Sequence, residues 1–373
     1  MVRLFRGSSP RPIIEYLTTD NEEGVNWVKI GDVPTSGRII TSTEEKITKE
    51  GAKKSRHVYV GDLILSNSMS YGLPYIMGIE GCIHDGWFVL RDYEQNFNKD
   101  YLCNLLISDI VQKQYKKIAA GGVVQNISSD LVNSVYISIP SLDEQRKIAG
   151  LLSLIDERIA TQNKIIEDLK KLKCAIIDYT IETLQTDYIE FSEVYDMAGE
   201  GGTPSTSNME YYENGCIPFV KIEDLKQKYL VSNKDHITEL GLQKSSAWLI
   251  PTNSILFSNG ATIGEISITT YPVCTKQGIL GIVPKVNFDT EYLYYLMSSR
   301  YFKREICRII TEGTMKTAYL KDINKIRCPI PSKAIQQEIV SLPSVLDTKI
   351  EIEQRILEKF ICQKQYLLRQ MFI

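Results

Sequence analysis

The sequence is an internal duplication, in which segments of the first half recur about 190 residues later. The strings WVKIGD and FVKIED begin at Trp27 and Phe219, and the strings LILSN and ILFSN begin at Leu63 and Ile255. Six such blocks keep one order and nearly one spacing, which chance similarity between strand-rich segments would not produce. Solenoid repeats have only about 20–45 residues, so this period indicates a duplicated domain. The chain should therefore fold into two similar halves.

A long amphipathic helix follows the first globular part. Its apolar residues recur at alternating spacings of four and three, at Ile148, Leu152, Ile155, Ile159, Ile166, Leu169 and Ile176, with Gln162 at the one polar seam position. This heptad pattern predicts a helix over residues 142–184 with a coiled-coil stripe. Ser141 and Glu144 have the spacing of a capping box at its start.

The second half repeats the helix. Its apolar residues are Ile335, Ile339, Leu342, Leu346, Ile350, Leu357, Phe360 and Leu367. Pro343 interrupts the pattern, so we expect a kink there or a restart near Ser344. A narrow stripe on so long a helix needs a partner, and the simplest partner is the other copy, packed antiparallel. The alternative is that each helix packs on its own globular part.

The predicted fold class is α+β, with two similar mixed α/β domains separated by two long antiparallel coiled-coil helices in a pseudo-two-fold internal repeat. The expected boundaries are 1–140 and 186–331 for the domains, and 141–185 and 332–373 for the helices. Strands are expected at 27–33, 62–66 and 135–139 and at their second-half equivalents. Helices are expected at 101–117 and 291–310.

The composition restricts the function classes. Lysines and arginines number 43 against 46 acidic residues, a net charge of −3, which argues mildly against a protein that binds DNA unaided. No apolar stretch is long enough to span a membrane and the N-terminus lacks a signal-peptide core, so a cytoplasmic location is expected. Eight cysteines without a CxxC pair and three isolated histidines predict neither disulfides nor a metal site.

Motifs that carry catalysis are missing. The sequence has no GxxxxGK phosphate loop, no GxSxG turn, no HExxH helix, and none of the Asn-Pro-Pro or Pro-Cys motifs of base-methylating enzymes. The acidic residues show no pairing that stands out from surface charge. We therefore expect no catalytic site in this chain.

The motifs together resemble a known family. The order GGTPSTSN, YYENGCIPFVKIEDL, SNGA and IPSKAIQQEI, ending in a long helix, is similar to the specificity subunits of type I restriction–modification systems. The segment IPSLDEQRKIAGLLSLIDERI resembles that family's central conserved region. The resemblance implies two target recognition domains that each contact one half of an asymmetric, bipartite site in double-stranded DNA.

The resemblance also implies partners. The paired helices would set the spacer between the half-sites and dock the DNA methylation subunits, which are expected in two copies. Those subunits would use S-adenosylmethionine, and restriction and translocation subunits would use ATP and Mg²⁺. This chain itself would hold no cofactor and perform no catalysis.

Base contacts require polar side chains on loops that reach a groove. The candidates in the first domain are Ser66, Asn67, Ser68, Tyr71, His84, Gln125 and Asn126. The candidates in the second domain are Ser258, Asn259, Thr262, Lys276, Gln277, Lys316 and Thr317. The expected phosphate contacts are Lys53, Lys54, Arg56, Lys226, Lys228 and Lys244. The alternative is that the Ser and Asn residues stabilise turns and that the lysines form a solvated surface.

The two halves open differently. A strand-like segment over residues 188–197 precedes the GGTP block of the second half, whereas the first half starts almost directly at Gly7. We expect either that part of this opening is absent or that the chain is permuted, with its helix completed from the C-terminal end of the chain. Two other functions stay open: a modification-only or type II-like assembly with the same kind of chain, and a coiled-coil scaffold that binds protein and no DNA.

Overall fold

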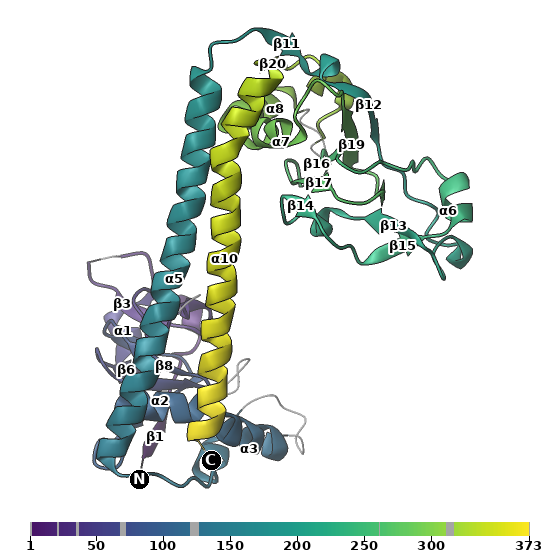
Figure 1. The fold of residues 1–373 in the computed structure, drawn as a ribbon. Coiled ribbons are helices and arrows are strands. Elements are labelled where there is room, and N and C mark those ends of the chain that lie inside the picture. The colour runs from purple at the N-terminus through teal and green to yellow at the C-terminus, as the bar shows by residue number, and fades with distance from the viewer. Residues whose placement is uncertain are drawn as a thin grey trace. The chain divides into compact units, whose positions relative to one another are not determined.

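The computed structural model describes residues 2–20, 22–34, 37–67, 72–119, 127–260, 262–310 and 317–372. The chain forms two compact units (Figure 1). Unit 1 comprises Met1–Asn163 with Arg355–Ile373, and unit 2 comprises Lys164–Gln354. The long helices α5 (Leu142–Thr183) and α10 (Lys333–Met371) contribute to both units. Each unit therefore contains one globular part and a stretch of both helices.

Unit 1 has two five-stranded sheets. The first has the order β1 (Arg3–Arg6), β10 (Trp87–Arg91), β7 (Leu63–Ser66), β8 (Pro74–Met77) and β4 (Ile39–Ile40). The second has the order β2 (Leu17–Thr18), β5 (Glu45–Ile47), β3 (Val25–Val28), β9 (Gly81–Ile83) and β6 (Arg56–Val58). The helices are α1 (Lys49–Lys53), α2 (Lys99–Ile107), α3 (Asp109–Ala119) and α4 (Ser129–Asn133), with 3₁₀ turns at Ile13–Glu15 and Ile30–Asp32.

Unit 2 repeats the first sheet strand for strand. The order is β12 (Tyr195–Glu200), β19 (Ile279–Pro284), β16 (Ile255–Ser258), β17 (Ile266–Thr269) and β14 (Tyr229–Leu230). A smaller sheet contains β15 (Asp235–Ile237), β13 (Ile217–Val220) and β18 (Cys274–Thr275), and a two-stranded sheet joins β11 (Tyr188–Glu190) to β20 (Arg327–Pro329). The helices are α6 (Glu239–Gln243), α7 (Thr290–Ser298), α8 (Arg300–Ile309) and α9 (Leu320–Ile323), with 3₁₀ turns at Phe191–Glu193, Met209–Tyr211 and Ile222–Asp224. The matching sheet order confirms the duplication predicted from sequence.

The two long helices contact each other within each unit, as the heptad patterns predict. In unit 1, Lys364 on α10 pairs with Asp156 on α5. In unit 2, Lys173 on α5 pairs with Asp347 on α10, with Nζ 2.5 Å from Oδ1. The two pairs are repeat equivalents with the helices exchanged. The internal duplication therefore extends to the long helices.

A buried glutamine fastens each long helix to its globular part. The fully buried Gln145 accepts a hydrogen bond from the backbone N–H of Asn98 (2.9 Å) and donates to the carbonyls of Asn96 and Pro140. Its equivalent Gln336 accepts from the N–H of Asp289 (2.8 Å) and donates to a proline carbonyl in the same way. Buried amides left without partners are costly, so these bonds fix where each helix begins relative to its domain.

The predicted capping box at the start of α5 is present. The backbone N–H of Ser141 donates to the Glu144 carboxylate (3.1 Å), and the N–H of Glu144 donates to the Ser141 hydroxyl (3.4 Å). The expected restart at Pro343 is wrong, because α10 continues through it. Pro343 is itself buried beside Val340 and Leu346, so packing holds the helix together where local propensity would end it.

Two further expectations are corrected. Each helix expected at 101–117 and 291–310 is a pair of helices, broken at Ser108 and Ser299. Ser299 has an extended backbone, and its hydroxyl accepts from the N–H of Phe302 (3.3 Å), so it caps the second helix. Residues 135–139, expected as a strand, have no strand partner among the described residues, whereas their equivalents in unit 2 include β20, which pairs with β11.

Both ends of the described chain pack into the core of unit 1. Val2 and Leu4 lie against the same buried cluster as Leu367, Leu368 and Met371 near the end of α10. Phe372 is 6% exposed, and its ring centroid lies 5.1 Å from that of Tyr101.

Candidate DNA interface

The first two predicted base-contacting residues are buried. The Ser66 hydroxyl accepts from the backbone N–H of Leu73 (3.0 Å), and the Asn67 side chain donates to the carbonyl of Asp85 (2.9 Å). Both bonds hold turns next to β7. These contacts match the alternative interpretation, in which Ser and Asn stabilise turns.

Their equivalents in unit 2 make the same kind of contact. The Ser258 hydroxyl accepts from the N–H of Glu265 (2.8 Å), and the Asn259 amide donates to the carbonyl of Ala318 (3.2 Å). Both side chains are at most 2% exposed. The Ser-Asn pair is identical in the two halves, which was the signal available in the sequence: shared residues build the common loop, whereas residues that distinguish two different ligands must differ.

The predicted base-contacting position occupied by His84 in unit 1 has a different residue in unit 2. The ring of His84 is mostly buried beside Trp27, and its Nε2 accepts from the N–H of Ile30 (3.2 Å). Burial lowers the pKa of His84, although the nearby Asp85 opposes this effect. The equivalent residue in unit 2 is the exposed Lys276, followed by the exposed Gln277. Lys276 and Gln277 are therefore accessible to a ligand.

The other predicted base contacts divide between exposed and undescribed positions. Thr262 is exposed and Thr317 is half-buried. Ser68, Tyr71, Gln125, Asn126 and Lys316 lie outside the described residues.

The predicted basic cluster of unit 1 is larger than the sequence indicates. Lys53, Lys54 and Arg56 are all exposed. Arg56 donates through Nε to the carbonyl of Arg6 (3.2 Å), and the Ser8 hydroxyl donates to the carbonyl of Lys54 (3.2 Å). These contacts bring the N-terminal strand and the loop after it to the predicted cations.

Arg6 and Arg11 complete this surface next to Asp85. Arg6 donates to the backbone carbonyl of Asp85 (3.1 Å), and Arg11 Nη2 lies 3.5 Å from the Asp85 carboxylate. We call the surface formed by Arg6, Arg11, Lys53, Lys54 and Arg56 the Asp85 cluster. Sequence reasoning missed the two arginines because they lie more than 70 residues from Asp85 along the chain.

The carboxylate at the centre stays charged. Burial alone would raise the pKa of Asp85, but the hydrogen bond from Ser9 (3.0 Å) and the charges of His84 and Arg6 outweigh burial and hold that pKa below its usual value. Asp85 contacts the two arginines, Arg6 through its backbone carbonyl and Arg11 through its carboxylate, and it is one carboxylate beside five cationic side chains. The cluster therefore keeps a positive excess that suits phosphate oxygens.

The corresponding surface of unit 2 lacks three of these cations. Arg6, Arg11 and Arg56 are replaced by Glu200, Ser205 and Trp248 at equivalent positions. The Glu200 carboxylate accepts from the N–H of Gly278 (3.0 Å). Among the predicted phosphate contacts here, Lys226 and Lys244 are exposed.

Lys228, also predicted to contact phosphate, has a mostly buried side chain, whereas a phosphate contact requires an exposed cation. Its side chain is 9% exposed, and Nζ donates to Glu291 (2.5 Å), to the Tyr295 hydroxyl (2.8 Å) and to the Ser344 hydroxyl (2.9 Å). Withdrawing it would leave a partly buried carboxylate without its cation. Its equivalent Arg38 similarly donates to Asn104 (2.7 Å). We therefore assign Lys228 to the junction between the globular part and α10, and leave it out of the proposed phosphate contacts.

The described residues offer no metal-binding or membrane-spanning element. That part of the chain contains no group of three or more His, Cys, Asp or Glu side chains placed to hold a metal ion. All eight cysteines are free, and four of them are buried. Across the same residues, no helix has the length and apolar character needed to cross a membrane.

The fold and this surface define a class: a duplicated protein with two mixed α/β domains, paired helices and a cationic surface on one domain. The model of the type I restriction modification DNA specificity domain matches residues 10–171 and again 186–360. The chain therefore belongs to the family of type I restriction–modification DNA specificity domains.

Individual relatives agree with this assignment. The chain is 31% identical over 179 residues to the type I restriction enzyme MjaIX specificity subunit of Methanocaldococcus jannaschii, covering 46% of this chain and 41% of that one. It is 30% identical over 263 residues to the EcoR124I/EcoR124II specificity subunit of Escherichia coli, covering 66% and 62%. These alignments thus span about two fifths and three fifths of the relatives' lengths. A putative specificity subunit, MjaX of M. jannaschii, is 25% identical and covers 92% of this chain and 87% of that one.

Solved structures share the fold. A chain from a study of complex assembly and conformational transition of the type I R-M system superposes with a TM-score of 0.65 at 17% identity, covering 98% of this chain and 96% of that one. The type I restriction–modification S subunit from M. genitalium gives a TM-score of 0.53 at 16% identity, covering 100% and 94%.

Proposed function

We propose that this chain supplies the DNA sequence specificity of a type I restriction–modification assembly. Each globular part contacts one half of a bipartite site, and the paired helices set the spacer. The observation that supports this most directly is the duplication itself: two units share sheet order and buried contacts, yet differ in the exposed residues at equivalent positions. Two similar heads with unlike surfaces suit two unlike half-sites.

We further propose that the chemistry belongs to partner subunits. Methylation subunits, two for each chain, would use S-adenosylmethionine, and restriction and translocation subunits would use ATP and Mg²⁺. Family membership supports this division of labour. In unit 1, DNA phosphates would contact the Asp85 cluster; in unit 2, Lys226, Lys244 and Lys276 are the accessible cations near the corresponding loops.

The proposal is tested by exchanging one unit's recognition surface. The chain is produced with its methylation partner, and the methylated sites in host DNA are mapped before and after residues 1–140 are replaced by the equivalent domain of a relative. We expect one half of the methylated motif to change while the other half stays the same. A change in both halves would contradict the modular assignment.

The spacer role has its own experiment. Four residues, about one helical turn or 6 Å, are inserted at matched positions in both α5 and α10. We expect the spacer of the methylated motif to lengthen with both half-sites unchanged. An unaltered spacer would remove the role of the helices in setting it.

The scaffold function is the second candidate, and the net charge of −3 favours it. The two functions separate in one measurement, because a scaffold with its methylation partner would not retain mixed-sequence duplex DNA. Retention that weakens as salt rises would support DNA binding.

A further inference from the structure

The two units differ at one strand edge. In unit 2, β11 adds to β20 with Tyr188 opposite Pro329 and Ile189 opposite Cys328. The pairing extends beyond the strand, since Ile330 N–H donates to the carbonyl of Asp187 (3.1 Å) and Phe191 N–H donates to the carbonyl of Ile326 (2.9 Å). Because strand residues alternate in direction, residues 326, 328 and 330 all present their main-chain groups to this added segment.

The equivalent residues of unit 1, over 135–139, have no strand partner in the part of the chain that the structure describes. Within the described residues, the main-chain groups of Ile137 and Ile139 make no hydrogen bond. The opposite side of the same segment is held, because the Gln114 amide accepts from Tyr136 N–H (3.1 Å) and donates to its carbonyl (3.0 Å). We call residues 135–139 the open edge. A fixed row of unpaired groups is a template for a further strand.

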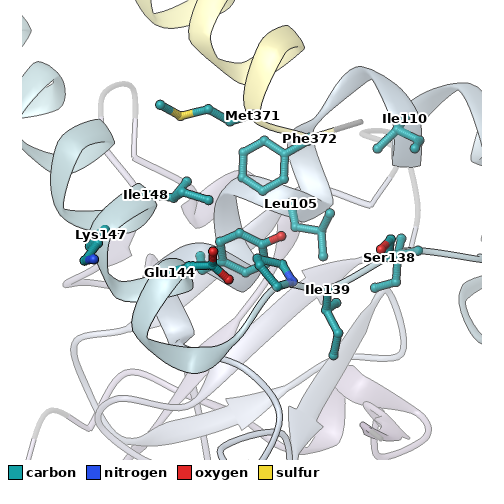
Figure 2. Close-up of a pocket in the computed structure, with 12 residues that line it drawn as sticks. Leu105, Ile110, Ser138, Ile139, Glu144, Lys147, Ile148, Met371 and Phe372 are labelled. Atoms are coloured by element: carbon teal, nitrogen blue, oxygen red, sulfur yellow. The ribbon is translucent and has the colours of Figure 1, made fainter.

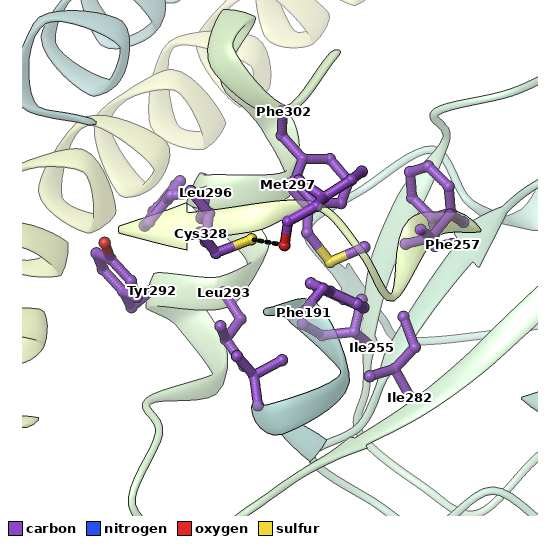
Figure 3. Close-up of a cluster of buried hydrophobic side chains, with 14 of the residues drawn as sticks. Phe191, Ile255, Phe257, Ile282, Tyr292, Leu293, Leu296, Met297, Phe302 and Cys328 are labelled. Atoms are coloured by element: carbon purple, nitrogen blue, oxygen red, sulfur yellow. Dashed lines mark hydrogen bonds between the residues drawn. The ribbon is translucent and has the colours of Figure 1, made fainter. Parts of the chain in front are cut away.

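A cavity lies beside the open edge where unit 2 has a phenylalanine. In unit 2, Phe191 is fully buried, with its ring centroid 5.6 Å from that of Phe302, in the cluster that Figure 3 shows. The equivalents of its neighbours in unit 1 include Leu102, Leu106 and Val111, and these line an apolar cavity of about 400 Å³. A dry apolar cavity of about 150 Å³ already binds benzene, so this one has room for an aromatic side chain.

A second cavity adjoins the other end of the open edge. Figure 2 shows it between Ile139, Ile110, Ile148 and Phe372. Its volume is about 490 Å³. At the corresponding place in unit 2, Tyr188 of the added strand packs against Tyr301, with 6.3 Å between the ring centroids. Tyr301 is the equivalent of Ile110. Unit 1 therefore has both the hydrogen-bonding edge and the two side-chain pockets of a strand site.

We propose that the open edge and its two cavities bind an extended segment of a partner polypeptide, which adds an antiparallel strand and inserts an aromatic side chain. Unit 2 gives the chemistry of this segment. Its strand YIE is followed at once by Phe191 and three residues later by the fully buried Val194. The partner segment thus has a short apolar strand, then Phe, then a branched aliphatic residue. Strand addition supplies affinity through main-chain bonds, and the pockets supply selectivity.

A labelled peptide with the sequence of residues 186–195, TDYIEFSEVY, tests the site by fluorescence anisotropy against the full chain. We expect saturable binding, weakened about tenfold or more when the phenylalanine is replaced by alanine, since the buried aromatic supplies much of the apolar contact. An absence of saturable binding would overturn the proposal.

Two matched proline variants locate the bound peptide. Ile137→Pro removes an N–H that faces the vacant side and should weaken binding about tenfold or more. Ser138→Pro is the control, because its equivalent is Pro329 and its nitrogen faces away. Equal binding by both variants and the parent chain would place the peptide elsewhere and refute the site.

A cavity-filling variant guards against misfolding as an explanation. Val111→Trp, in the wall of the first cavity, should raise the melting temperature or leave it unchanged while blocking the peptide. If the peptide binds this folded variant as tightly as the parent, the aromatic pocket is not used and the proposal fails.

Discussion

Unit 1 and unit 2 share their interior and differ on their surface. The buried glutamines, the Ser-Asn turns and the helix ion pairs occur at equivalent positions in both units. The Asp85 cluster of unit 1 has an acidic, a neutral and an aromatic residue at three equivalent positions of unit 2. Residues that repeat therefore maintain the fold, and residues that diverge are free to distinguish two ligand surfaces.

The largest expected effect comes from the shared interior. Gln145→Ala leaves the N–H of Asn98 and two carbonyls without their buried partner, which should lower the free energy of unfolding of unit 1 by about 2–4 kcal/mol. Hydrogen exchange should show reduced protection at the starts of α2 and α5, with unit 2 unchanged. Gln336→Ala should destabilise unit 2 in the same way and reduce protection at the starts of α7 and α10, with unit 1 unchanged. An effect spread evenly over both units would contradict the local anchoring role.

The Lys228 junction should be nearly as sensitive. Burial would raise the pKa of Glu291, but hydrogen bonds from Lys228, Ser344 and Tyr229 outweigh it and hold the pKa below its usual value. Lys228→Met removes the cation and should destabilise unit 2 by about 3 kcal/mol at neutral pH. The matched variant Lys226→Met changes an exposed lysine and should cost little.

The same junction predicts a pH dependence. A carboxyl group whose pKa is lowered by folding contributes stability above its unfolded pKa and loses it as the pH falls through the folded value. The melting temperature of the parent chain should therefore fall on acidification below about pH 4.5, the ordinary pKa of glutamate. The Lys228→Met variant should lose the part of this fall that comes from Glu291. Identical profiles for parent and variant would show that the pair contributes nothing.

The surface difference between the units can be reduced by mutation. Replacing Arg6, Arg11 and Arg56 by alanine removes three cations of the Asp85 cluster and should weaken DNA binding by the chain with its methylation partner about 10- to 100-fold at low salt. The slope of log K against log salt should become shallower by up to about 2.7, or 0.9 for each phosphate that is no longer neutralised. Glu200→Arg adds a cation at the equivalent position of unit 2 and should strengthen binding. Unchanged slopes would exclude the cluster from DNA binding.

The smallest effect concerns a pair of exchanged charges. In unit 1, Asp109 on α3 pairs with Arg369 on α10 at 3.2 Å; in unit 2, Arg300 on α8 pairs with Asp178 on α5 at 3.6 Å. Arg300→Asp should destabilise unit 2 by only about 0.5–1 kcal/mol, because Arg300 is largely exposed. Adding Asp178→Arg should restore the charge pairing of unit 1, although it removes the hydrogen bond that Asp178 accepts from the backbone N–H of Arg300 (2.7 Å). A double variant no more stable than Asp178→Arg alone would mean that the charges do not interact.

Local patterns in the sequence predicted much of this architecture. The repeat of WVKIGD as FVKIED predicted two similar domains, the heptad residues around Leu152 and Leu346 predicted the paired helices, and Ser141 with Glu144 predicted the helix start. Each of these signals lies within one helix or strand, or in the repeated copy of the same segment in the other half. Helix periodicity and capping depend on neighbours a few residues away, so they can be recognised without knowing the fold.

The tertiary structure decided which distant groups meet. Only folding brings Arg6 to Asp85 and Lys228 to Ser344, and only the absence of a partner in the described part of unit 1 leaves residues 135–139 unpaired where the sequence predicts a strand. A strand requires a second segment to accept its hydrogen bonds, and a lysine becomes buried only when several elements close over it. Such properties depend on long-range contacts, which the spacing of residues along one segment does not contain.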